Sequence, residues 1–415
     1  MKELLNSRAV RAWLALGWPQ PAIIQHTDLT SFAQELAATD LTGCVLLGCK
    51  FDDTLRQQLL RQNVHVVPDV GALPLPFVCF PTKLYDAASL YHGFDPVKVD
   101  SWQHTPDHKG WAFFMSQDGV TPNSLDIAQS ASTRLHDTSI EHAAARFLTN
   151  HRRPAIAFMG GHDVHRNVSD YRQVVQLARD LRRKGYMVVT GGGPGLMEAA
   201  NLGAFLSTQP DDAIEHALAA LPQKHFKSHE WLSTAAAVRA KFNGNWNAPI
   251  EGEQTSLAMP TWRYGHEPPN LFASHIAKLF NNSLREDGLV TVASGGIIFG
   301  PGSAGTVQEV FQDLTQNYYR GAMSPTPMVF LNPAYWSRAS DDLAALSPHM
   351  IPNQSLLALV RQLAAEKDFL SEILASDDIV EIAQFLDRAP SKPKSARRIA
   401  DVRIASRSSD EPAAP

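Results

Sequence analysis

Short apolar runs bounded by glycine alternate with amphipathic stretches in the second half of the chain. The runs at residues 155–159, 186–190 and 297–299 are rich in aliphatic and β-branched side chains. Such runs are typical of strands that are covered on both faces of a parallel sheet. Residues 170–184 repeat apolar side chains at helical spacing, and Gly185 follows as a stop signal. The pattern therefore predicts alternating strands and helices.

Each of these three strands leads directly into a glycine-rich turn and then a helix. This order predicts an α/β fold with a doubly wound, mostly parallel, Rossmann-like sheet. Ligands of such sheets bind outside the carboxyl ends of the strands, where all three turns would lie. Further elements are predicted as strands at residues 256–259 and 328–331, and as helices at residues 271–284, 356–365 and 379–386.

The first third of the chain follows a different pattern. Strand-like runs at residues 44–47 and 64–67 flank a helical stretch at residues 52–62, which predicts a short βαβ unit. We therefore divide the chain into an N-terminal α/β domain of unknown role (residues 1–139), a Rossmann-like domain (140–389) with a helical insertion at about 209–247, and a tail (390–415) whose low apolar content predicts disorder.

Composition narrows the range of partners. The 415 residues carry a net charge of −5, which argues against an extended nucleic-acid surface. No run approaches the length of a membrane span, and no cluster with metal-ligand spacing stands out, so we expect no membrane, metal or cofactor. Cys44, Cys49 and Cys79 are few and odd in number, which favours buried thiols in a reducing, cytoplasmic setting.

The glycine turn after residues 297–299 predicts an anion site. Gly300, Gly302 and Gly305 allow sharp turning and close approach of a ligand to the backbone. The helix start that follows presents N–H groups that favour a phosphate. The turn lacks the lysine of a P-loop, and residues 191–196 do not match the dinucleotide pattern G-x-G-x-x-G, which disfavours both of those classes. A tight turn without a ligand remains the alternative for residues 191–195.

Two of the turns together resemble a known family. Gly191-Gly-Gly-Pro-Gly-Leu-Met-Glu198 and Pro301-Gly-Ser-Ala-Gly-Thr-Val-Gln-Glu309 are similar to the paired motifs of the Lonely Guy (LOG) family, which are nucleoside 5′-monophosphate phosphoribohydrolases. Gly160-Gly161-His162 and Glu267-Pro-Pro-Asn270 resemble its longer bacterial branch, the purine/pyrimidine nucleotide 5′-monophosphate nucleosidases. The resemblance covers about residues 150–390. It implies a nucleoside monophosphate substrate and a homodimer or higher homo-oligomer.

The sequence departs from the family pattern at three places. The turn from Gly300 is one residue longer than the family's loop. The family's usual pair of acids is Gln308-Glu309 here, so only the second acid is kept. Arg285 stands where the family's arginine is expected, but Glu286 replaces the lysine that follows it.

Cleavage of a ribose–base bond develops positive charge on the sugar, so a carboxylate placed near the sugar, or near a water that it activates, would favour the reaction. We expect Glu309 to have this role and Arg285 to bind the phosphate or keep Glu309 ionised, as the resemblance implies. Two structural alternatives remain open. Thr306-x-x-Glu309 is also a capping box, and Arg285 could be a solvated cation at a helix end.

The remaining candidates surround the predicted nucleotide. Glu267 and Asn270 could line the base side. The predicted phosphate- and sugar-binding residues are Gly160, Gly161, His162, Gly191, Gly192, Gly193, Gly195, Met197, Glu198, Gly300, Gly302, Ser303, Ala304, Gly305 and Thr306. The sequence predicts hydrolysis of nucleoside 5′-monophosphates to free base and ribose 5-phosphate. A non-catalytic nucleotide sensor that uses the same glycine turns is the alternative.

Overall fold

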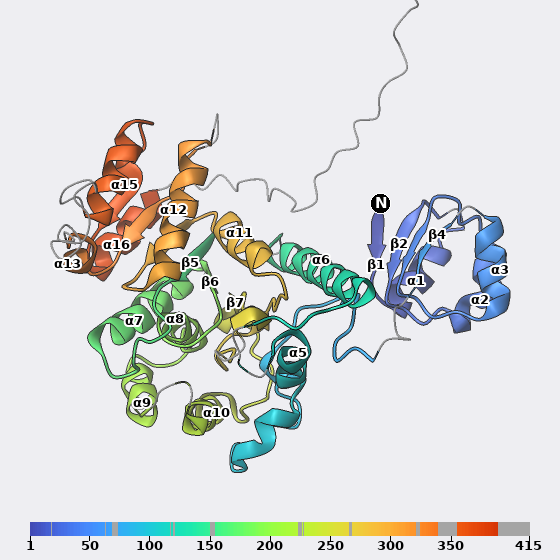
Figure 1. Cartoon of the computed structure of the whole chain (residues 1–415), viewed down its shortest axis with the longest axis horizontal. Helices are drawn as coiled ribbons and strands as arrows, with labels where there is room; N and C mark the ends of the chain where they lie inside the picture. Colours follow the sequence, from blue (N-terminus) through green and yellow to red (C-terminus); the bar gives the residue numbers. More distant parts are fainter. Residues whose placement is uncertain are drawn as a thin grey trace, which may run out of the picture.

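Two parallel sheets organise the molecule in a computed structural model of the chain (Figure 1). The structure describes residues 1–17, 19–62, 64–68, 74–116, 118, 121–149, 154–222, 226, 228–264, 268–320, 324–338 and 355–388. The predicted tail, residues 390–415, lies outside these ranges. The predicted α/β class with a Rossmann-like sheet is confirmed.

The larger sheet has seven parallel strands in the order β11-β10-β9-β5-β6-β7-β8. Chain order reverses direction between β5 and β9, so the switch point of the sheet lies between these two neighbouring strands. Ligands of open α/β sheets bind at this point, outside the carboxyl ends of the strands. The strands are β5 (Ala155–Met159), β6 (Met187–Thr190), β7 (Ser256–Ala258), β8 (His275–Ile276), β9 (Gly296–Phe299), β10 (Met328–Phe330) and β11 (Ile373–Ala375).

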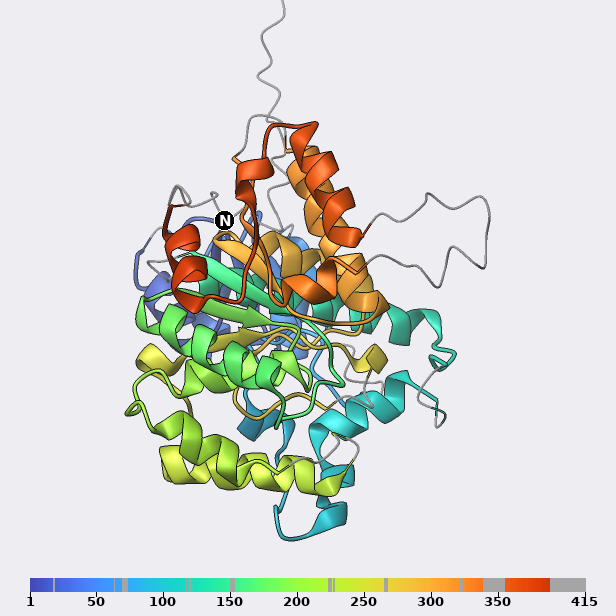
Figure 2. The same ribbon diagram turned by 90° about the vertical axis from the view of Figure 1, so that its left-hand side faces the viewer.

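Helices cover both faces of this sheet, because alternate side chains of each strand point in opposite directions. In β5, Ile156 and Phe158 pack into one core, and Ala157 and Met159 into the other. The views in Figures 1 and 2 show the two helical layers on either side of the strands. One layer contains α7 (Ser169–Arg183), α8 (Leu196–Phe205), α9 (Ala213–Ala220), α10 (His229–Asn243) and α16 (Ile379–Arg388); the other contains α11 (Asn282–Val292), α12 (Ala304–Tyr318), α13 (Pro333–Trp336) and α15 (Leu356–Ala365).

The smaller sheet has four parallel strands in sequential order and its own core. Cys44 and Cys49 are buried in that core, and Cys79 is buried further along the chain, as the sequence predicts. The strands are β1 (Lys2–Leu4), β2 (Ala22–Gln25), β3 (Val45–Leu47) and β4 (His65–Val67), and the helices are α1 (Ser7–Leu14), α2 (Ala33–Ala37) and α3 (Asp53–Arg61).

Helix α6 (Ile127–Thr149) corrects the predicted domain boundary, because the position between residues 139 and 140 falls inside this single helix. The stretch before it, including α4 (Ala87–Leu90) and α5 (Pro106–Phe114), packs with the larger unit: Leu90, for example, belongs to the core around β5. At its far end α6 reaches the small sheet, where Arg146 pairs with Glu3 at 2.6 Å.

The helix predicted at residues 271–284 is wrong. This stretch holds the two-residue strand β8, and α11 begins only after Asn281, whose side chain accepts a hydrogen bond from Ser283 N. A strand of two residues is too short to show a repeating apolar pattern. The apolar residues that favour a helix at 271–280 are instead buried in the irregular segments on either side of β8. The predicted insertion at about 209–247 does contain helices, α9 and α10. Among the described residues, no helix has both the length and the apolar character needed to cross a membrane.

Candidate functional site

The three glycine turns meet at the switch point of the large sheet. Gly161 N donates to Pro301 O at 2.8 Å, and Leu196 N donates to Gly161 O at 3.2 Å. Gly195 has a positive φ of +66°, and a Cβ there would lie 2.2 Å from Gly161 O. Only glycine fits this crossing, so the turns after β5, β6 and β9 form one continuous surface.

The turn after β6 is held in place by buried polar side chains. Gly192 N donates to Thr190 Oγ1, and the Asn270 amide donates to Gly192 O at 3.0 Å and Gly193 O at 3.2 Å. Asn270 is fully buried, and its own oxygen accepts from two backbone N–H groups. Its observed role is to fix the glycine turn, and its predicted contact with a base stays a prediction. Glu267 lies outside the described residues.

The turn after β9 presents an uncapped helix start. Helix α12 begins at Ala304, and the side chain of the preceding Ser303 makes no capping hydrogen bond. The first N–H groups of a helix have no partner within the helix, so they are available to an anion. A Cβ at Gly305 would meet no atom within 4 Å, which places open space directly beside these groups. Thr306, in contrast, is buried against Gly302.

The capping-box alternative for Glu309 is wrong. A capping box needs the glutamate at the third residue of the helix, and that position in α12 is Thr306. Glu309 lies almost one turn further along the helix. Its carboxylate faces α11 instead, where Oε1 lies 3.6 Å from Nη1 of Arg285.

Arg285 is not a solvated cation at a helix end. It lies near the start of α11, where the helix dipole does not favour a cation, and its side chain is only 12% exposed, as is that of Glu309. The guanidinium packs against Gly191, whose Cβ would lie 3.3 Å from Nη2 of Arg285 and 2.8 Å from Sδ of Met197. Arg285 Nε is buried without a hydrogen-bond partner among the described residues. The hydrogen-bonding capacity of Arg285 is therefore incompletely satisfied among the described residues.

The surroundings of Glu309 change its acidity. Burial raises the pKa of its carboxyl, Arg285 lowers it, and the negative charge of Glu286 raises it again, with a net result of about 7. Carboxyl groups with a pKa near the working pH are suited to proton transfer. Glu309 therefore has the acidity of a general acid or base at neutral pH.

A pocket lies beside Arg285, which is the member of the pair that lines it. The sequence predicts four of its lining residues. It missed three that follow β7, although the strand itself was predicted and its carboxyl end had to lie at the same sheet edge. The lining consists of Gly191, Gly193, Met197 and Arg285, which the sequence predicts, and of Pro260, Thr261 and Tyr264, which it missed.

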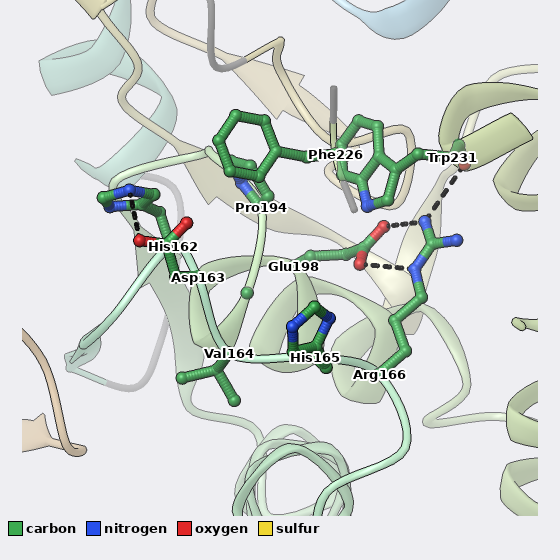
Figure 3. Close-up of a pocket in the computed structure, with 10 residues that line it drawn as sticks. His162, Asp163, Val164, His165, Arg166, Pro194, Glu198, Phe226 and Trp231 are labelled. Carbon is green, nitrogen blue, oxygen red and sulfur yellow. Dashed lines mark hydrogen bonds and ion pairs between the residues drawn. The ribbon is translucent and has the colours of Figure 1, made fainter. Parts of the chain in front are cut away.

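A second pocket is lined by Pro194 and Gly195, at the far end of the same glycine turn (Figure 3). His162 lines it and pairs with Asp163 at 3.1 Å. Phe226 and Trp231 also line it, and the Glu198 carboxylate points toward Arg166.

Glu198 is held differently from Glu309. It is fully buried, and its two oxygens accept from Arg166 Nη2 at 2.5 Å and Nε at 2.9 Å. Tyr171 donates a third hydrogen bond at 3.0 Å, and Arg166 also donates to the backbone oxygen of Trp231. This ion pair ties α8 to the turn after β5 and to α10. The predicted contact of Glu198 with a sugar hydroxyl stays a prediction.

Comparisons with known proteins add the following findings. No family model matches the chain, and no curated protein matches it. Among solved structures, it is similar to the molybdenum cofactor binding protein from the phototrophic bacterium Rippkaea orientalis, at 15% identity over 57% of this chain and 96% of that one, with a TM-score of 0.32. It is also similar to the molybdenum cofactor carrier protein from Chlamydomonas reinhardtii, at 15% identity over 52% of this chain and 99% of that one, with a TM-score of 0.26. These values are too low to bear on function.

Proposed function

We propose that the protein hydrolyses the N-glycosidic bond of nucleoside 5′-monophosphates to free base and ribose 5-phosphate. The observation that carries this proposal is the Arg285–Glu309 pair: two mostly buried ionisable side chains 3.6 Å apart, of which Arg285 lines a pocket at the carboxyl ends of β6 and β7. An ion pair whose function is purely structural has no need of an adjoining pocket or of a carboxyl with a pKa near 7.

The phosphate would bind at the start of α12. The uncapped N–H groups of Ala304, Gly305 and Thr306 and the open space in front of Gly305 support this placement. The sugar would then lie near Glu309, which belongs to the second turn of the same helix. Arg285 stabilises negative charge at either the phosphate or the carboxylate.

The base would extend toward the pocket after β7. Tyr264 is partly exposed there, and Met197 and Pro260 supply apolar contacts. Stacking of a base on an aromatic side chain contributes about 1–3 kcal/mol and tolerates different bases. The resemblance to LOG enzymes, which rests on the paired glycine motifs, supports the same orientation and a homo-oligomeric state.

The test is incubation of the full-length protein with AMP, GMP, IMP, CMP and UMP, with free base and ribose 5-phosphate measured by chromatography. We expect Glu309→Gln to lose about 10²- to 10⁴-fold in turnover, the usual contribution of a group that transfers protons. Glu366→Gln is the matched control, because Glu366 contacts Tyr318 at the opposite end of α12.

The outcomes separate the two function classes. Base release that depends on Glu309 supports the hydrolase. Nucleotide binding by calorimetry without release of any base would instead favour the alternative from the sequence, a nucleotide sensor that uses the same turns. Equal turnover by Glu309→Gln and the wild type would remove Glu309 from the mechanism.

A further inference from the structure

Glu286, the neighbour of Arg285 in α11, is held by two side-chain amides. Gln308 Nε2 donates to Oε2 of Glu286 at 2.7 Å, and Asn282 Nδ2 donates to Oε1 at 2.5 Å. These two hydrogen bonds fix the position of the Glu286 carboxylate between α11 and α12, next to Arg285 of the candidate catalytic pair.

Glu309 has the opposite surroundings. Its polar contact among the described residues is Arg285, at the long distance of 3.6 Å. Burial is the largest influence on its pKa, and the negative charge of Glu286 acts in the same direction, so the neutral acid is favoured. The two carboxyl groups on neighbouring helices therefore have unequal surroundings: Glu286 accepts two hydrogen bonds, whereas the nearest polar partner of Glu309 among the described residues lies 3.6 Å away.

Among the described residues, the charges that act on the pKa of Glu309 come from a single neighbouring helix. Helix α12 packs against α11 and α15. The charges that act on Glu309 are Arg285 and Glu286, both from α11. Other acids on the packed elements are engaged elsewhere: Asp313, one turn further along α12, accepts from Thr326 Oγ1, Asp287 of α11 is exposed, and Glu366, just after α15, accepts from Tyr318.

We propose that Glu286 and Glu309 form an unequal pair, in which Glu286 stays a carboxylate and Glu309 is the carboxylic acid that protonates the departing base. This inference rests on the proposed function and assigns the direction of proton transfer. As the C1′–N bond breaks, its electron pair goes to the base, and Glu309 donates its proton to a base nitrogen. Water then bonds to C1′ and returns a proton to Glu309. Glu286 touches no reacting atom and is a positioning residue.

The same contact accounts for two departures from the family pattern. Glu286 stands in place of a lysine, and Gln308 stands in place of an acid. In this structure the two substituted side chains bond directly to each other at 2.7 Å. A lysine at position 286 would lower the pKa of Glu309, whereas the glutamate raises it. With glutamate at 286 and glutamine at 308, the contact between α11 and α12 is a hydrogen bond, and residue 286 raises the pKa of Glu309 where a lysine would lower it.

The first test is the pH profile of base release from AMP. If Glu309 acts as an acid, kcat/KM falls as the pH rises through about 7. Glu286→Gln removes one negative charge while preserving shape, so this descending limb should move down by roughly 0.5 to 1 pH unit. The double variant Glu286→Lys/Gln308→Glu should move it further, and Glu366→Gln should leave it in place. An ascending limb near pH 7, or an unmoved limb in Glu286→Gln, would overturn the inference.

The second test does not require turnover. The Glu309 carboxyl carbon is titrated by ¹³C NMR in the labelled full-length protein and is assigned by its loss in Glu309→Gln. The expected result is a midpoint near 7 that falls in Glu286→Gln. If the wild type releases no base but this shift is seen, then the proposed function fails while the effect of Glu286 on Glu309 stands. A midpoint that Glu286→Gln does not move overturns the pair itself.

Discussion

Two arginine–glutamate pairs lie on opposite sides of the glycine turn after β6, and they are built differently. Arg166 and Glu198 are 2% and 0% exposed, form two short hydrogen bonds, and are supported by Tyr171. Arg285 and Glu309 are each 12% exposed and lie 3.6 Å apart. The first pair is fully satisfied within the protein. The second is less buried and leaves Arg285 Nε without a hydrogen-bond partner among the described residues.

The difference in burial and hydrogen bonding between these two arginine–glutamate pairs shows how the same two residue types can stabilise the fold or take part in a reaction. A buried charge pair with every oxygen engaged keeps its geometry, because any rearrangement exposes an unpaired charge to a low dielectric. A looser pair near solvent can exchange its partner for a ligand at much lower cost. We therefore expect changes in the Arg166–Glu198 pair to affect folding, and changes in the Arg285–Glu309 pair to affect chemistry.

The largest effect is expected when the satisfied pair is broken. Arg166→Met leaves the Glu198 carboxylate buried without its cation, which typically costs about 3–5 kcal/mol. Urea unfolding measures this loss. Arg172→Met is the control, since Arg172 and Glu215 form an exposed pair whose contribution should be below about 1 kcal/mol.

A double variant sharpens the same prediction. Arg166→Met combined with Glu198→Met removes both charges and should recover part of the lost stability. If the double variant were less stable than Arg166→Met alone, the cost would come from lost packing, and the ion pair would not be what holds α8, α10 and the turn after β5 together.

The second largest effect is expected at the crossing of the turns. Gly195→Ala forces a side chain into a backbone with φ of +66° and places its Cβ 2.2 Å from Gly161 O. With ψ of −133°, this backbone lies in a region that is accessible essentially only to glycine, and its strain together with the forced shift of the backbone should cost about 2–4 kcal/mol. Thermal unfolding tests this, and an alanine variant with unchanged stability would mean that the turns do not pack as described.

The sequence predicts this crossing only in part. Strands and glycine turns are marked by local patterns, so the strand at residues 155–159 and the turn that begins at Gly191 are predicted correctly. The fold class follows from the order of these elements along the chain. The partner of Glu198 is Arg166, 32 residues earlier, and no local pattern marks such a pair. Strand β8 has two residues and pairs through its backbone, so it leaves no apolar periodicity to detect.

Glu309 illustrates the same limit at the site. Its residue type and position beside a glycine turn predict a functional carboxylate, but the sequence equally permits a capping box. The distinction depends on where the helix begins, at Ala304, and element boundaries are poorly determined by local pattern. Tyr264 could not be predicted because its place in the pocket depends on the path of the chain after β7.

The third effect is a pH-dependent difference in stability at the loose pair. The pKa of Glu309 is raised from 4.5 to about 7 in the folded protein, so the folded state binds more protons than the unfolded state between these values. Its contribution to stability is complete below pH 4.5 and is lost as the pH rises through 7. Glu309→Gln should therefore match the wild type near pH 4. At pH 8 it should be more stable by up to about 3 kcal/mol, because the net pKa shift, which already includes the attraction of Arg285, disfavours the charged carboxylate in the folded protein.

Urea unfolding at both pH values checks this prediction. Glu198→Gln is the comparison across the glycine turn: it weakens the satisfied pair and should be destabilised at pH 8, the reverse of Glu309→Gln. Equal destabilisation of both variants would contradict the distinction between the two pairs.

The smallest effect on folding is expected at Gly305, on the open side of the turns. Its Cβ would meet no protein atom, and alanine is a better helix former than glycine, so Gly305→Ala should keep or slightly raise the stability. The added methyl group enters the space in front of the uncapped N–H groups, where a phosphate would lie, and we expect AMP binding measured by calorimetry to weaken about tenfold. Ala304→Gly is the control: it removes a methyl group from the same helix start, so it should slightly lower the stability and leave AMP binding unchanged. If Gly305→Ala still bound AMP tightly, the phosphate would not lie at the start of α12.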